Sequence, residues 1–248
     1  MANIVQQKIT LQISDGTSMN AFVARPGGKE KSPGVLVFQE AFGVNAHIRD
    51  VTQRVAKEGY VAIAPEMFHR TAAPGFEASY TDMQSVMPHL RALTEAGMSD
   101  DIRAAHAWLQ KDSQAADRIA SIGFCMGGRV SFLACATVAV RAAISFYGGG
   151  IAPALLPRAR ELGAPMLFFW GGLDKHIGKD QIRSVTEALD KESKTYTNVE
   201  ISDADHGFFC DQRASYNPNA ARQAWALSRA FLDMHLKPEV ADAPAGKG

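Results

Sequence analysis

A cysteine stands at the centre of the sequence Gly-x-Cys-x-Gly, Gly123 to Gly127, directly after the mostly apolar run 118–122. A nucleophile on a sharp turn between a buried strand and a helix forms a nucleophile elbow, in which Cys125 here replaces the usual serine. The flanking glycines leave room for a strained backbone and for close packing of strand against helix. The N-terminal end of the following helix favours a thiolate. Cys125 is therefore a candidate nucleophile, and the alternative is a small buried hydrophobic residue.

A thiol nucleophile needs a base, and the base needs an orienting acid. In an α/β-hydrolase the acid and then the histidine follow the nucleophile, each in a loop after a late strand. Asp174 follows the run "PMLFFWG", and His206 follows "TNVEIS". Each alone could be an ordinary loop residue, but their order predicts a triad with Cys125. Asp203 and Asp205 are rival acids, and we expect them to shape the loop that carries His206.

Acyl transfer also needs two hydrogen-bond donors for the oxyanion. The expected donors are the amide of Met126, which follows the nucleophile, and an amide in "QEAFG", that of Ala41. Glu40 begins the same loop and should lie near Cys125. A carboxylate beside a thiol opposes thiolate formation unless it is engaged elsewhere.

The other cysteines, Cys135 and Cys210, lack an elbow and are expected to pack in the interior. The sequence holds no CxxC pair and no His-Cys cluster at metal-ligand spacing, so we expect neither a disulfide scaffold nor a metal site, and no cofactor. His69 and His176 could line a pocket, but a surface position is the better expectation for both. Surface positions are expected for the remaining histidines, which are His47, His89, His106 and His235.

Charge and composition narrow the possible partners. Lys+Arg and Asp+Glu number 26 each, so no long-range field favours nucleic acid or an anionic membrane. The N-terminus lacks a signal-peptide pattern, and no window approaches the roughly 18 apolar residues of a membrane span. We expect a cytoplasmic protein that acts on a small molecule; the sequence leaves the oligomeric state open.

Strand and helix patterns alternate along the chain and must position these residues. Apolar and polar residues alternate from Ile4 to Ala24 around the turn Asp15-Gly16, which predicts an antiparallel hairpin. Helix 99–111 would begin at an N-cap, Ser99 or Asp100. The fold class is α/β, with a mostly parallel central sheet, the hairpin at its N-terminal side and helices on both faces. Strands are expected at 34–40, 60–65, 118–123, 141–148, 165–171 and 197–202, and further helices at about 48–57, 126–137, 180–191 and 219–236. We predict one domain over residues 1–236 and a disordered tail over 237–248.

Five motifs in order, "QEAFGVN", "GYVAIAPEMF", "GFCMGG", "GGLD" and "DADHGF", resemble those of the dienelactone hydrolases, the cysteine branch of the α/β-hydrolase fold. The resemblance extends from the hairpin to the final helix. It implies Cys125 as nucleophile, His206 as base and Asp174 as the residue that orients the base. It also implies that Glu40 interacts with the resting thiol and is displaced when substrate binds.

The sequence departs from this family at two arginines that bind the substrate carboxylate. The segment after "PG" at Pro74-Gly75 has no arginine, and the position four residues beyond His206 is Cys210. Arg70, in "EMFHR", and Arg213 are weaker candidates for substrate binding.

The function expected from these observations is hydrolysis of small carboxylic esters or lactones by a Cys-His-Asp triad. One alternative is a non-catalytic ligand-binding or regulatory protein on the same fold, and another is a thiol-based redox sensor.

Overall fold

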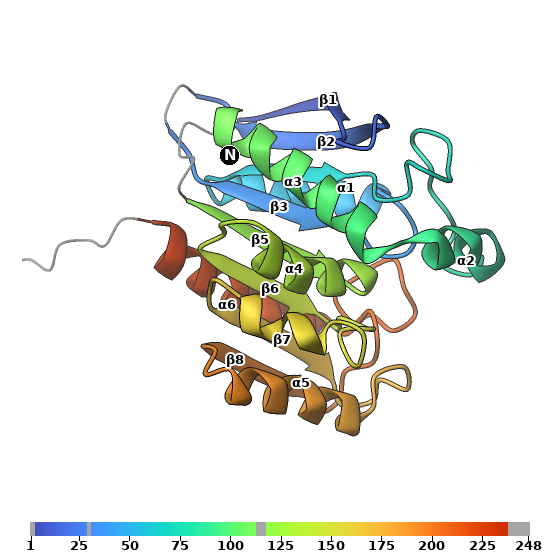
Figure 1. Ribbon diagram of the computed structural model, residues 1–248, viewed down its shortest axis with the longest axis vertical. Helices are drawn as coiled ribbons and strands as arrows, with labels where there is room; N and C mark the ends of the chain where they lie inside the picture. The colour runs from blue at the N-terminus through green and yellow to red at the C-terminus, as the bar shows by residue number, and fades with distance from the viewer. Residues whose placement is uncertain (1–2, 29–30, 113–117, 238–248) are drawn as a thin grey trace, which may run out of the picture.

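One mixed sheet of eight strands runs through the part of the chain that the computed structural model describes, residues 3–28, 31–112 and 118–237 (Figure 1). The order of the strands is β1-β2-β4-β3-β5-β6-β7-β8. Their bounds are β1 (Ile4–Gln12), β2 (Ser18–Pro26), β3 (Gly34–Phe38), β4 (Val61–Pro65), β5 (Ile119–Phe124), β6 (Ala142–Phe146), β7 (Met166–Gly171) and β8 (Tyr196–Ile201).

The hairpin and the parallel strands form for different physical reasons. The turn between β1 and β2 contains Gly16, whose φ of +85° suits glycine. β2 pairs antiparallel with both β1 and β4, and all later pairs are parallel. Strands β3 to β7 are buried along their whole length, as the continuous apolar runs predict for strands covered on both faces.

Helices cover both faces of the sheet. Figure 1 shows α3, α4 and α5 in front of the strands, and α1 and α6 pack on the opposite face. This arrangement confirms the predicted α/β-hydrolase fold. The helical segments are α1 (Ala46–Lys57), α2 (Met83–Ala92), α3 (Glu95–Asp112), α4 (Met126–Thr137), the 3-10 helix η1 (Leu156–Glu161), α5 (Lys179–Lys191) and α6 (Pro218–Leu236).

Three helical features differ from the sequence predictions. α2 and η1 were not predicted; α2 contains Pro88 and has one buried residue, Val86, so its pattern is weak. α3 begins at Glu95, so the prediction of Ser99 or Asp100 as its N-cap is wrong. Ser99 is buried within the helix. Serine is typical of N-caps, so a serine inside a helix can be mistaken in the sequence for the start of that helix.

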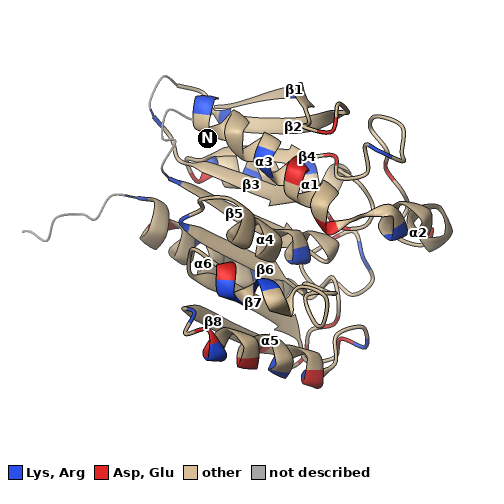
Figure 2. Ribbon diagram, in the orientation of Figure 1, with Lys and Arg blue, Asp and Glu red and all other residues tan. Residues whose placement is uncertain are grey.

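Charged residues lie mainly on helices and loops, while the strand ribbons carry few of them (Figure 2). Both signs are interspersed along α5. In the described part of the chain no helix is both long and apolar enough to cross a membrane. The single sheet extends from Ile4 to Ile201. The predicted tail falls, from residue 238 onward, outside the described residues.

Candidate active site

Cys125 occupies a strained turn between β5 and α4. Its φ of 56° and ψ of −118° are unfavourable for a residue with a side chain, and such strain persists where the surrounding structure enforces it. A Cβ on Gly123 would overlap the carbonyl oxygen of Gly127, and one on Gly127 would overlap that of Phe38. The two glycines therefore permit the close packing that a nucleophile elbow requires, and they leave Cys125 only half-buried.

The structure brings the three predicted triad residues together from three strand ends. His206 Nε2 lies 3.1 Å from Cys125 Sγ, and His206 Nδ1 lies 2.7 Å from Asp174 Oδ2. The other oxygen of Asp174 accepts hydrogen bonds from the amides of His176 and Ile177, at 2.7 and 3.2 Å. Backbone donors thus fix the carboxylate, and the carboxylate in turn fixes the imidazole.

Charge interactions in this chain favour a protonated His206. Burial disfavours the imidazolium, but the hydrogen bonds and negative charges of Asp174 and Cys125 outweigh burial and raise the pKa of His206 to about 10. Burial likewise opposes the ionised form of Asp174, yet the hydrogen bond and charge of His206, with two backbone amides, hold the pKa of Asp174 below its usual value. The arrangement suits an imidazolium that stabilises a neighbouring thiolate.

The segment that carries His206 is anchored in the core by two phenylalanines. Phe208 and Phe209 are 0% and 2% exposed. The Phe208 ring centroid lies 5.3 Å from that of Tyr147, and the Phe209 centroid lies 5.2 Å from that of Phe124. Aromatic packing therefore positions the backbone on which the imidazole is mounted.

Asp203 and Asp205, the two rival acids, make hydrogen bonds within the segment that carries His206, as expected. Asp205 Oδ1 accepts a hydrogen bond from the backbone N–H of His206 at 2.6 Å. The Asp203 carboxylate and carbonyl oxygens accept from Asn217 Nδ2. Asp174 is the acid that contacts the imidazole ring.

The two predicted oxyanion donors, Met126 and Ala41, lie at the start of α4 and in the loop after β3. Met126 is the first residue of α4, so its amide has no carbonyl partner within the helix. Ala41 lies in the loop after β3. Within the described residues neither amide donates in a turn, loop or side-chain hydrogen bond, so both remain available to a developing oxyanion.

Glu40, in the loop after β3, and Arg213, in the segment after β8, form a partly buried ion pair. Arg213 Nη1 donates to Glu40 Oε1 at 3.2 Å, and Glu40 is fully buried. Burial raises the pKa of Glu40 even though the charges of Arg213 and His206 oppose that shift. The Arg213 guanidinium also lies 5.7 Å from the ring centroid of Tyr80. The resting partner of Glu40 in this structure is thus an arginine.

Arg70 is engaged away from these residues. Its guanidinium donates twice to Asp101, at 2.9 Å in each case, and once to Asp15 at 2.7 Å. These bonds tie the hairpin turn to α3. Of the two predicted arginines, only Arg213 lies next to the segment that carries His206, where it packs against Gly207.

Two residues beside Cys125 and His206 escaped the sequence analysis. Tyr147 follows β6 with a φ of 36°; its ring lies 5.1 Å from that of His206, and its buried hydroxyl has no partner among the described residues. Arg129, in the first turn of α4, is half-buried and interacts electrostatically with Cys125. Two features of the sequence could have indicated them. Tyr147 stands at the end of a predicted strand, and Arg129 follows Cys125 by four residues, which is one helical turn.

The predicted positions of the histidines were partly wrong. His47 and His106 are buried, at 1% and 6% exposure, where surface positions were expected. His106 Nε2 lies 3.0 Å from the carbonyl oxygen of Ala139, and imidazole can pack in a core when such a partner is present. His176 is exposed, as expected, and its ring lies 5.3 Å from that of His206, whereas His69 bonds to Asp101.

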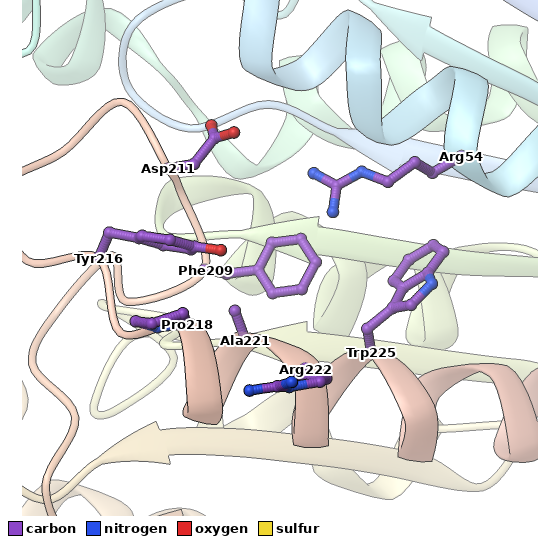
Figure 3. Close-up of a pocket in the computed structure, with 8 residues that line it drawn as sticks. All are labelled: Arg54, Phe209, Asp211, Tyr216, Pro218, Ala221, Arg222 and Trp225. Atoms are coloured by element: carbon purple, nitrogen blue, oxygen red, sulfur yellow. The ribbon is translucent and has the colours of Figure 1, made fainter.

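A pocket of about 390 Å³ lies on the α1 and α6 side of the sheet (Figure 3). The Arg54 guanidinium lies 5.1 Å from the ring centroid of Phe209 and 5.7 Å from that of Trp225. None of the three triad residues lines this pocket. This pocket is therefore separate from the three triad residues.

Comparisons with known proteins agree with the geometry. The family model described as "Dienelactone hydrolase family" matches residues 19–236. A Synechocystis protein named "Putative carboxymethylenebutenolidase" is 38% identical over 227 residues, which cover 87% of this chain and 92% of that protein. A Bradyrhizobium protein named "Probable 2-oxo-3-(5-oxofuran-2-ylidene)propanoate lactonase" is 29% identical over 90% of this chain and 92% of its own length.

Solved structures show the same relationship. A crystal structure of a Klebsiella pneumoniae protein named "Putative Dienelactone Hydrolase" has a TM-score of 0.85 and 31% identity, and the alignment covers 93% of this chain and 98% of that one. The chain therefore belongs to the dienelactone hydrolase family and is a carboxylic ester hydrolase.

Proposed function

We propose that this protein hydrolyses small carboxylic esters or lactones with Cys125 as nucleophile, His206 as base and Asp174 as the residue that orients the imidazole. The observation that carries the proposal is the continuous chain of contacts from Asp174 through His206 to Cys125, at 2.7 and 3.1 Å. Membership of a hydrolase family supports it and leaves the non-catalytic alternative without support.

The proposed reaction has two steps. The Cys125 thiolate attacks the acyl carbonyl, and the Met126 and Ala41 amides stabilise the oxyanion. When the C–O bond breaks, imidazolium His206 gives its proton to the leaving alkoxide and a thioester remains. Neutral His206 then takes a proton from water, and the resulting hydroxide attacks the thioester. The acid product leaves, and the proton on His206 restores the starting charge pair with the thiolate.

Arg213 is the proposed anchor for a substrate that carries a carboxylate. It is a charge-bearing donor that a second carboxylate could engage, and it lies beside the His206 segment. The names of the relatives, a carboxymethylenebutenolidase and a lactonase of a propanoate, describe substrates of this type. Binding of such a substrate would compete with Glu40 for the guanidinium.

The test is hydrolysis of p-nitrophenyl acetate and of a dienelactone by wild type, Cys125→Ala and Arg213→Gln. Loss of both activities in Cys125→Ala is expected, and residual hydrolysis near the wild-type rate would refute the nucleophile. Arg213→Gln should raise KM for the anionic lactone by at least about tenfold while changing KM for the neutral acetate far less. Equal effects on both substrates would refute the anchor.

Glu40 is proposed to lower the fraction of Cys125 that pairs with His206 as a thiolate until substrate binds. Its buried carboxylate adds negative charge near the site and is held by Arg213. A nearby negative charge disfavours a thiolate. In the Glu40→Gln variant, iodoacetamide should therefore alkylate Cys125 faster at neutral pH than in wild type. Asp205→Asn, which changes a carboxylate on the same loop as His206, is the matched control. An unchanged or slower rate in Glu40→Gln would contradict the restraint.

A further inference from the structure

A second group of reactive side chains lies outside the triad. Glu40, in the loop after β3, His47, in the first turn of α1, and Cys210, in the segment after β8, converge so that one oxygen, one nitrogen and one sulfur all lie within 4.8 Å of one another. Their positions in the chain, 40, 47 and 210, have no spacing typical of a metal site, which explains the sequence expectation that there was none.

Several polar atoms of this cluster lack partners. Glu40 Oε2 and both nitrogens of His47 make no hydrogen bond in the described structure. Glu40 and Cys210 are 0% exposed, and His47 is 1% exposed. A buried polar group without a partner costs about 1–3 kcal/mol, so most buried polar groups in native proteins are hydrogen-bonded. Unpartnered atoms on two neighbouring side chains point to an electrophilic ligand that both could bind.

The donor set indicates which ligand. A carboxylate oxygen, an imidazole nitrogen and a thiolate sulfur are the ligands of Zn²⁺, whereas Mg²⁺ and Ca²⁺ prefer oxygen alone. Bonds of about 2.0–2.3 Å place the ligand atoms of tetrahedral Zn²⁺ about 3.3–3.8 Å apart, so modest side-chain rotations would close this cluster around an ion. We propose that Glu40, His47 and Cys210 form a binding site for a zinc-class divalent cation.

Neighbouring side chains fit this assignment. His47 Nδ1 lies 3.8 Å from Asp211 Oδ1, and a carboxylate next to a metal-binding imidazole commonly orients the ring. The Cys210 thiol donates to the Tyr80 hydroxyl at 3.1 Å, so its sulfur is already held by a polar group. Arg213 contacts Oε1 of Glu40 and leaves Oε2 for the ion.

Binding balances in charge and protons. The sulfur–metal bond forms as the Cys210 S–H bond breaks, and that proton passes to solvent. The thiolate and the Glu40 carboxylate then neutralise the two charges of the cation. Asp211 Oδ1, which lies 3.8 Å from His47 Nδ1, adds a further negative charge at the edge of the cluster.

The site is testable independently of the proposed hydrolysis in a Cys125→Ala background, which removes the thiol next to His206. Co²⁺ is the probe, because a Co²⁺–thiolate bond gives a near-ultraviolet charge-transfer band, and Zn²⁺ should displace it. We expect one equivalent of Co²⁺ with that band. The further substitutions Cys210→Ser and His47→Gln should each weaken binding at least tenfold, and Cys210→Ser should abolish the band.

Matched controls are Cys135→Ser, a second buried thiol, and His106→Gln, a second buried imidazole. Both should leave affinity and band unchanged. Circular dichroism identifies any variant that fails to fold. If Cys210→Ser or His47→Gln does not fold, the Co²⁺ affinity of the other variant tests the proposal. Absence of the band in the parent, its persistence in folded Cys210→Ser, or equal affinity in folded His47→Gln would overturn the proposal.

Discussion

The contact between Asp174 and His206 offers a quantitative test of the triad. In Asp174→Asn, the amide oxygen can still accept from the amides of His176 and Ile177. The NH₂ group would then face His206 Nδ1, 2.7 Å away, and would require that nitrogen to accept. The hydrogen of a neutral ring would move to Nε2 and point at Cys125 Sγ, so the imidazole could not take a proton from the thiol.

Two effects set the size of the expected loss in kcat/KM for Asp174→Asn. Loss of a hydrogen bond to a charged group costs about 1.5–3 kcal/mol, which corresponds to about 10-fold to 150-fold in rate at 1.36 kcal/mol per decade. The reversed tautomer adds to this loss, because the same change in a serine triad lowers kcat by about 10⁴. We expect kcat/KM of Asp174→Asn for p-nitrophenyl acetate to fall by about 10² to 10⁴.

Asp205→Asn supplies the matched comparison, since Asp205 bonds to the backbone of His206 and keeps an oxygen for that bond after substitution. Its kcat/KM should stay within about threefold of wild type. Thermal melts monitored by circular dichroism would show that both variants fold. The reasoning is refuted if Asp174→Asn retains activity within about fivefold of wild type, or if Asp205→Asn loses as much.

Two further predictions concern stability. Gly127→Ala should lower the free energy of unfolding, measured in urea, by about 1–3 kcal/mol, because the new Cβ would overlap carbonyl oxygens at the end of β3. The control is Gly149→Ala, whose Cβ would have its nearest neighbour at 3.9 Å and which should change the free energy of unfolding by less than about 0.5 kcal/mol. Similar losses in both variants would contradict the packing argument. The pKa of His206 rises from 6.5 to about 10 on folding, so the stabilisation of its charged form is complete below pH 6.5 and is lost as the pH rises through 10. The free energy of unfolding contributed by this group should therefore fall across that interval, and it should fall less in Asp174→Asn; identical pH dependence in urea titrations of the two proteins would argue against the charge interaction.

The sheet and the triad were predictable because their signals are local. Strands such as β5 and β7 are buried on both faces and appear in sequence as continuous apolar runs. Parallel strands bring their carboxyl ends to one edge of the sheet. The positions of Cys125, Asp174 and His206 after β5, β7 and β8 therefore predicted their convergence before any distance was known.

The remaining features depend on tertiary contacts. α2 buries only Val86, so its apolar periodicity is too weak to distinguish it from a loop. His47 is buried because its ring packs edge-on against the rings of Phe124 and Phe209, whose centroids are each 6.1 Å away, and those residues come from distant segments. The partner of Glu40 was hidden for the same reason, since Arg213 is far from it in sequence.

The buried rings of Phe208 and Phe209 also limit how often the catalytic histidine can leave its place. To release His206 by local unfolding, the segment must withdraw both phenylalanines from the core. Exposing each ring costs about 1.5–3 kcal/mol, so the opened form would be present in fewer than about one molecule in a hundred. Adjustments to substrate must therefore come mainly from side chains such as Glu40 and Arg213, while the backbone that carries the imidazole behaves as part of the rigid core.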